Sequence, residues 1–160
     1  MDIFYTDGST LNNGQFGKQI ARICVTTGEG KLLVDHLIGD KTNIETEAFA
    51  ILAAMKRVRD EKITDAQIRT DSNFWAKAVE HRWKLREMRL FPLRDLMYKL
   101  ADETKVDVIW IPREQNPAGQ YLEANPTRKP RGKKEPRTFH CPHCGKPIVN
   151  GYRRSDDATA

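Results

Sequence analysis

Three carboxylates stand where core elements begin or end, and acidic side chains at such places can do chemistry. Asp7 follows the β-favouring residues 3–6 and precedes a glycine, so it lies at or just past the end of a predicted strand. Asp71 follows residues 68–70 in the same way. Glu47 lies in the first turns of a predicted helix, one residue before its apolar stripe. If the two strands pair in parallel, both aspartates reach the same edge of the sheet.

Three converging carboxylates repel one another unless cations hold them together. Oxygen ligands suit Mg²⁺ or Mn²⁺, and two such ions roughly 3.5–4 Å apart activate water and stabilise the leaving oxygen in phosphodiester cleavage. The pattern therefore predicts a divalent-metal site made of Asp7, Glu47 and Asp71. Asp7 taken alone has an ordinary alternative, because Asp-Gly is by itself a turn signal.

The elements that must position these side chains follow from the spacing of the apolar residues. Thr42 or Asn43 can cap a helix over residues 42–60, whose apolar residues recur at helical spacing. Strands are expected at residues 2–6, 16–27, 31–38, 67–70 and 106–111, and further helices at 72–81, 93–103 and 116–123. This order predicts an α/β fold in which three antiparallel strands and then two parallel ones form a mixed sheet flanked by helices.

Composition and charge limit the class of protein. The 160 residues contain no apolar run that approaches 18 residues, so no membrane span is expected. We also see no secretory signal at the N-terminus. Three cysteines do not make a disulfide framework, which favours a cytoplasmic protein. The net charge of +5 is uneven: residues 1–126 hold 18 basic and 19 acidic side chains, whereas residues 127–138 hold six basic and one acidic. Such a run is a solvated tether or a phosphate-binding arm.

The motifs together resemble type 1 ribonuclease H over about residues 1–125. The resemblance is carried by residues 3–9, by Thr42-Asn43 with Glu47 five residues after Thr42, and by residues 70–74. It implies a ribonuclease H-like fold with a five-stranded mixed sheet, and Mg²⁺ or Mn²⁺ held by the three carboxylates. It also implies cleavage of the RNA strand of RNA–DNA hybrids, which leaves 5′-phosphate ends.

The same resemblance implies contacts with the hybrid. Asn43 and Asn73 match family positions near the 2′-hydroxyls or the bases, the groups by which a protein distinguishes RNA from DNA. The predicted substrate-binding residues are Gly8, Ser9, Asn43, Ser72, Asn73, Arg113 and Asn116.

The last predicted helix departs from the family pattern. The family usually places a fourth acidic ligand in Asn-x-x-Ala-Asp, but alignment on Asn116 puts Gln120 at the aspartate position. Glu123 lies three residues further on the same helix face and is one methylene longer, so we expect it to be the fourth catalytic and metal-binding carboxylate. The alternatives are a surface role for Glu123 and a neutral oxygen ligand at Gln120. The loop at residues 112–115 has no histidine, and Arg113 is its nearest basic substitute.

Other charged and aromatic residues allow two interpretations. Glu45 and Glu114 are acidic and close in sequence to the motifs, and we expect both to be solvated. The chain also contains Trp83, Lys84, Arg86 and Arg89. These residues predict either a modest basic and aromatic patch that binds nucleic acid, or a core tryptophan surrounded by solvated charges.

Residues 139–148 resemble one knuckle of a zinc ribbon. A structural zinc ion takes four ligands, and no Cys or His follows the last candidate. The sequence therefore leaves two alternatives. Either a zinc ion is shared between two copies or with a partner protein, or the knuckle binds no metal. The possible zinc ligands are His140, Cys141, His143 and Cys144. We expect a domain at 1–125, a basic linker at 126–138 that contacts nucleic acid, and a Cys/His tail at 139–160.

Two other functions fit parts of this pattern. A structure-specific DNA nuclease of the same fold would use the same carboxylates, but Asn43 and Asn73 favour a hybrid. A non-catalytic nucleic-acid-binding module is supported by Gln120 at the aspartate position. Clustered acids that face phosphates oppose it, because a binding module gains nothing from them.

Overall fold

The computed structural model describes residues 1–128, 138–140 and 147–149. The chain divides into two compact units, Met1–Thr127 and Arg128–Ala160. Within the described residues, no helix combines the length and the apolar character needed to cross a membrane.

In the second unit, the described residues include one small antiparallel pair of strands, β6 (Thr138–His140) and β7 (Pro147–Val149). Three of the predicted zinc ligands, Cys141, His143 and Cys144, lie outside the described residues. The fourth, His140, is described only as part of the β6 backbone. The zinc site therefore stays a prediction.

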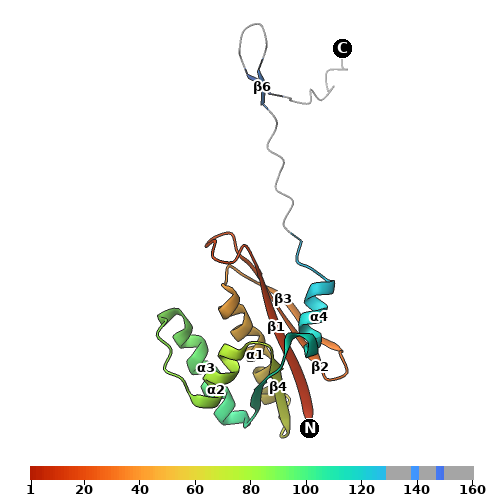
Figure 1. The fold of residues 1–160 in the computed structure, drawn as a ribbon, viewed down its shortest axis with the longest axis vertical. Coiled ribbons are helices and arrows are strands. Elements are labelled where there is room, and N and C mark those ends of the chain that lie inside the picture. Colours follow the sequence, from red (N-terminus) through yellow and green to blue (C-terminus); the bar gives the residue numbers. More distant parts are fainter. Residues whose placement is uncertain (129–137, 141–146, 150–160) are drawn as a thin grey trace, which may run out of the picture. The chain divides into compact units, whose positions relative to one another are not determined.

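A five-stranded mixed sheet forms the centre of the first unit, with the strand order β3-β2-β1-β4-β5 (Figure 1). Its strands are β1 (Asp2–Leu11), β2 (Ile20–Thr27), β3 (Leu32–Gly39), β4 (Ala66–Thr70) and β5 (Asp107–Trp110). The pairs β1–β2 and β2–β3 are antiparallel, and the pairs β1–β4 and β4–β5 are parallel. This confirms the predicted sheet of three antiparallel strands followed by two parallel ones.

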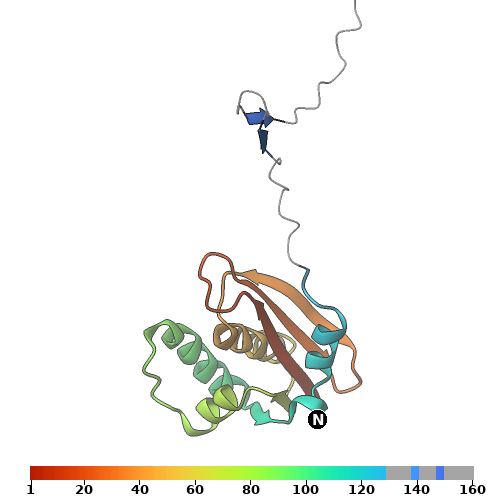
Figure 2. The same ribbon diagram turned by 45° about the horizontal axis from the view of Figure 1, so that its top comes forward.

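Helices cover both faces of this sheet. They are α1 (Asn43–Asp60), α2 (Asn73–His81), α3 (Phe91–Thr104) and α4 (Pro117–Ala124). Val25 of β2 belongs to the main core with residues of α1, α2 and α3, whereas the adjacent Cys24 packs against Ala118 and Leu122 of α4. Because neighbouring residues of a strand point to opposite faces, α1–α3 lie on one side of the sheet and α4 on the other (Figure 2).

The apolar stripe predicted for α1 is buried, as expected. Its members are each at most 2% exposed, namely Ala48, Ile51, Leu52, Met55 and Val58. Burial of an Ile, Leu, Val or Met side chain contributes about 1.5–3 kcal/mol. The stripe therefore holds α1 firmly against the sheet and makes it a rigid base for Glu47.

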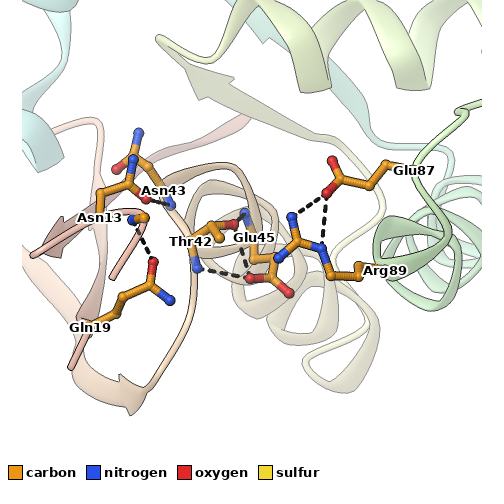
Figure 3. A network of polar contacts seen from close by, with 8 residues as sticks. Asn13, Gln19, Thr42, Asn43, Glu45, Glu87 and Arg89 are labelled. Carbon is orange, nitrogen blue, oxygen red and sulfur yellow. Dashed lines mark hydrogen bonds and ion pairs between the residues drawn. The ribbon is translucent and has the colours of Figure 1, made fainter. Parts of the chain in front are cut away.

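The N-terminus of α1 is closed by a capping box (Figure 3). Thr42 is the cap: its Oγ1 accepts from the Glu45 N–H, and its own N–H donates to Glu45 Oε2 at 2.8 Å. Arg89 lies beside Glu45 in Figure 3 and forms an ion pair with Glu87. The prediction that Glu45 is simply solvated is therefore wrong, because its carboxylate is half-buried and satisfies the helix terminus.

Strand β1 is longer than predicted. Asp7 was expected at or past the strand end, but β1 continues to Leu11 and Asp7 pairs with Cys24 of β2. Only the parallel pairing with β4 stops earlier, at Thr6 and Thr70. The antiparallel partner β2 supplies the hydrogen bonds that keep the strand extended beyond that point.

Candidate active site

The register of β1 and β4 brings two predicted carboxylates to one place. Thr6 and Thr70 form the last parallel pair, so Asp7 and Asp71 both follow it at the same end of these strands. Asp7 is only 7% exposed, and Asp71 is half-buried. The parallel neighbours predicted from the sequence therefore place the aspartates side by side.

Gly8 explains how Glu47 comes close to Asp7. A Cβ atom on Gly8 would lie 2.7 Å from Thr46 Cγ2 and 2.9 Å from the Glu47 nitrogen, which is closer than real Cβ atoms come to such neighbours. Only glycine therefore lets the first turns of α1 lie directly against β1. From the sequence, Gly8 indicates that the strand ends at Asp7, but in the structure it permits this close approach between the helix and the strand.

Glu47 is held by two neutral donors. The Ser72 hydroxyl donates to Glu47 Oε2 at 2.5 Å, and the Asn43 side-chain amide donates to Oε1 at 3.2 Å. Ser72 is only 5% exposed and positions Glu47 in the structure, and its predicted role in binding substrate stays a prediction. Asn43 is half-buried and lines the cavity beside the carboxylates, where a substrate can reach it.

Asn116 links the start of α4 to the carboxylates. Its side-chain oxygen accepts from the Ala118 N–H, which caps α4 as predicted. Its side-chain nitrogen donates to the Thr6 carbonyl at 3.0 Å and to Asp71 Oδ1 at 3.2 Å. Asn116 is fully buried and its side chain orients Asp71, and its predicted contact with substrate stays a prediction.

The three carboxylates line one cavity of about 510 Å³. Of the predicted substrate-binding residues, Gly8, Ser9, Asn43 and Arg113 lie in its wall, while Asn73 is exposed at the start of α2 outside it. Sequence reasoning missed three lining residues, Thr10, Trp110 and Leu122. Trp110 could have been found from its place near the end of the fifth predicted strand. In the structure its indole N–H donates to the Asp71 carbonyl at 3.2 Å, which places it beside the carboxylates.

Burial and like charge dominate the electrostatics of the cavity. Removal from water, followed by repulsion from Asp71, raises the pKa of Asp7 from 3.8 to about 7. Burial also raises the pKa of Glu47, although the hydrogen bond from Ser72 opposes this rise. The positive charge of Arg113 opposes the rise of the pKa in both carboxyl groups, so this guanidinium acts on more than one carboxylate of the cavity.

Glu123 and Gln120 lie in different environments on α4. Glu123 lines the cavity and forms an ion pair with Arg113, whose Nε and Nη2 lie 2.9 Å and 2.8 Å from Glu123 Oε1. Gln120 is exposed, and its side-chain nitrogen donates to the Glu114 carbonyl at 2.8 Å. Gly119 is the residue of α4 that lies against Asp7, because a Cβ atom on it would lie 3.1 Å from Asp7 Oδ2. The two residues do not share a common environment, and Glu123 is the one beside the carboxylates.

The donors of the cavity suit a hard divalent cation. They are carboxylate oxygens, and the largely buried Asp7 has a raised pKa, which a bound cation would reverse. Within the described residues, no three His, Cys, Asp or Glu side chains are arranged to hold a metal ion. The carboxylates of Asp7, Glu47 and Asp71 would therefore have to turn toward a common point to bind a cation. Each of them also accepts a hydrogen bond from a neighbour.

The comparison with protein families decides what kind of domain surrounds this cavity. The family model described as RNase H matches residues 2–116. The chain belongs to the RNase H family. The match ends at Asn116, where α4 begins, so the helix that carries Gln120 and Glu123 lies outside the matched segment of this RNase H protein.

Solved RNase H structures share the fold at low sequence identity. The N-terminal RNase H domain of a Mycobacterium tuberculosis protein, solved as a fusion with maltose-binding protein, is 23% identical with a TM-score of 0.62, covering 76% of this chain and 94% of that one. RNase H1 from the halophilic archaeon Halobacterium salinarum is 23% identical with a TM-score of 0.60, covering 76% and 92%. LC11-RNase H1, solved in complex with an RNA/DNA hybrid, is 24% identical with a TM-score of 0.58, covering 72% and 88%. These similarities confirm the predicted RNase H-like fold. A sequence search of curated proteins found no match.

Proposed function

We propose that this RNase H family protein hydrolyses the RNA strand of RNA–DNA hybrids with divalent cations and leaves 5′-phosphate ends. One observation carries the proposal: Asp7, Glu47 and Asp71, from three elements far apart in sequence, line a single cavity. A domain that only binds nucleic acid has no use for a cavity of carboxylates, because they repel phosphates.

Each residue has a defined part in this proposal. Asp7, Glu47, Asp71 and Glu123 hold Mg²⁺ or Mn²⁺ through carboxylate oxygens. Bound cations would activate the attacking water and stabilise the leaving oxygen of the phosphodiester. Outside this group, Ser72 keeps Glu47 in place through its hydrogen bond.

Several surfaces support a hybrid as the substrate. Asn43 lies in the cavity wall next to Glu47, where its amide can meet a 2′-hydroxyl of the strand that is cut. A second cavity of about 460 Å³ is lined by Trp83 and Phe74, with Lys84 and Arg86 beside them. Aromatic rings beside basic side chains suit the sugars, bases and phosphates of a nucleic-acid strand.

The experiment that tests the proposal compares substrates of one sequence: an RNA–DNA hybrid, an RNA duplex and a DNA duplex, each with Mg²⁺ or with EDTA. We expect cleavage of the RNA strand in the hybrid alone, only with the metal, and products that a 5′-phosphate-dependent exonuclease degrades. Asp7→Asn should lower the rate at least about a hundredfold, because it removes a metal ligand. Asp107→Asn, which changes an exposed carboxylate on β5, is the matched control and should cleave like the wild type.

Two results would overturn the proposal. Equal or faster cleavage of the DNA duplex would favour a DNA nuclease of the same fold. Tight hybrid binding without cleavage under any metal condition would favour a binding module.

A further inference from the structure

The charges in the cavity wall are unequal. Four carboxylates line the cavity, and among its described lining residues only Arg113 carries a positive side chain. The charge of Arg113 is felt by Asp7 and Glu47 as well as by its direct partner, Glu123. Arg113 therefore acts as a cation for a cavity that has an excess of negative charge.

Glu123 differs from the other three carboxylates in what holds it. Asp7 accepts from the Gly8 N–H, Glu47 accepts from Ser72 and Asn43, and Asp71 accepts from a buried asparagine, all of which are neutral donors. Glu123 is held by a guanidinium instead. A metal ion can approach the first three carboxylates without displacing a charge, but at Glu123 it competes with the Arg113 guanidinium.

The Arg113–Glu123 ion pair is exposed and can dissociate at little cost. The Arg113 and Glu123 side chains are 64% and 60% exposed, and both nitrogen contacts fall on one oxygen, Oε1. Exposed ion pairs contribute little stability, because water and salt screen them. Both side chains are long, and each can turn away from the other without disturbing the core.

We infer that the Arg113–Glu123 ion pair is an exchangeable latch, in which Arg113 occupies Glu123 until a divalent cation takes that carboxylate. The inference rests on the proposed metal-binding role of the cavity and goes beyond it. In the closed form, Arg113 partly neutralises the cavity. In the open form, Glu123 joins the metal ligands and the guanidinium is free to face the phosphates of the bound strand.

The test is Mg²⁺ binding to the full-length protein without nucleic acid, measured by titration calorimetry for a double-mutant cycle. The proteins are the wild type, Arg113→Gln, Glu123→Gln and the double variant. Both side chains are exposed, so these variants should fold normally, and thermal unfolding in EDTA checks this. Arg113→Gln should tighten Mg²⁺ binding by about tenfold, because it removes a repelling charge and frees Glu123.

The latch predicts a specific coupling within the cycle. Arg113→Gln should tighten binding much less in the Glu123→Gln background than in the wild type, because there is no carboxylate left to release. Arg113→Lys keeps the charge and is the matched control, with Mg²⁺ binding within a few-fold of the wild type.

Three outcomes would overturn the latch. Equal tightening in both backgrounds would show plain charge repulsion. Weakened binding in Arg113→Gln would show that the arginine supports the site, and unchanged binding would show that it does not compete with the cation. No Mg²⁺ binding to the wild type would remove the basis of the exchange. Because no substrate is present, the latch can hold even if the protein fails to cleave hybrids, and the cleavage assay tests the proposed function separately.

Discussion

Replacement of Asp7 by Asn should make the metal-free protein more stable at neutral and alkaline pH. The raised pKa means that the folded protein holds the Asp7 proton more tightly than the unfolded chain does. The stability contributed by this group is complete below about pH 4 and is lost as the pH rises toward 7. A rise of the pKa from 3.8 to about 7 corresponds to about 4 kcal/mol in favour of unfolding once Asp7 is ionised.

The expected gain is smaller than that limit. Asn cannot ionise, so it escapes the whole penalty, but burial of its amide costs about 1 kcal/mol or more. Asn also keeps an oxygen that can accept from the Gly8 N–H, the bond that Asp7 Oδ1 accepts at 2.8 Å. We therefore expect Asp7→Asn to raise the free energy of unfolding by about 2–3 kcal/mol at about pH 8.5 and to leave it equal or lower at about pH 4.

The assay is urea unfolding followed by circular dichroism in EDTA across this pH range. The pH dependence of the difference between the two proteins reports Asp7 together with its repulsion from Asp71 and Glu47, because the other ionisable groups are common to both proteins. Asp107→Asn is the matched control and should show no comparable pH-dependent gain, since its carboxylate is exposed. Added Mg²⁺ should stabilise the wild type more than Asp7→Asn, because the wild type retains this ligand. A variant that is less stable at alkaline pH, or a difference that does not change with pH, would refute the reasoning.

Three further predictions concern α4 and the basic segment. Glu123→Gln should lower hybrid cleavage at low Mg²⁺ by about a hundredfold, with partial rescue by Mn²⁺, whereas Gln120→Ala should change it little; the reverse ranking would make Gln120 the ligand. Deletion of residues 128–160 should flatten the salt dependence of hybrid binding, measured by fluorescence anisotropy, because each phosphate contact contributes about 0.9 to the log–log slope; an unchanged slope would show that the segment is only a spacer. Tyr121→Phe removes the hydroxyl that donates to Asp35 at 3.0 Å and should lower the free energy of unfolding measured in urea. No change would mean that this bond does not hold α4 to the sheet.

Much of the candidate site could be predicted because its signals are local. The residues around Asp7 and Asp71 favour strands, and Glu47 adjoins an apolar stripe at helical spacing, so short segments are enough to recognise them. The spacing of Thr42 and Glu45 is also a local signature of a capping box, so the role of Glu45 was available from the sequence.

Other roles depend on distances between residues that are remote in sequence. Position 8 requires glycine because α1 contacts β1 at Thr46, and no sequence pattern around Gly8 predicts that contact. Asn116 bonds to the carbonyl of Thr6, 110 residues earlier, and this contact exists only once α4 docks. The buried side chains of Ser72 and Asn116 likewise orient Glu47 and Asp71 only because the fold brings these elements together.

The sequence by itself determined that a carboxylate and an amide, Glu123 and Gln120, stand one helical turn apart on the last helix. Only the tertiary structure decided which of them lines the cavity. The rotation of α4 about its own axis is set where Leu122 packs against Cys24 of β2 and where Tyr121 donates to Asp35 of β3. Both strands are remote from α4 in sequence. The physical reason is that the period of a helix fixes the angle between two of its residues, whereas packing against other elements fixes the direction in which each one points.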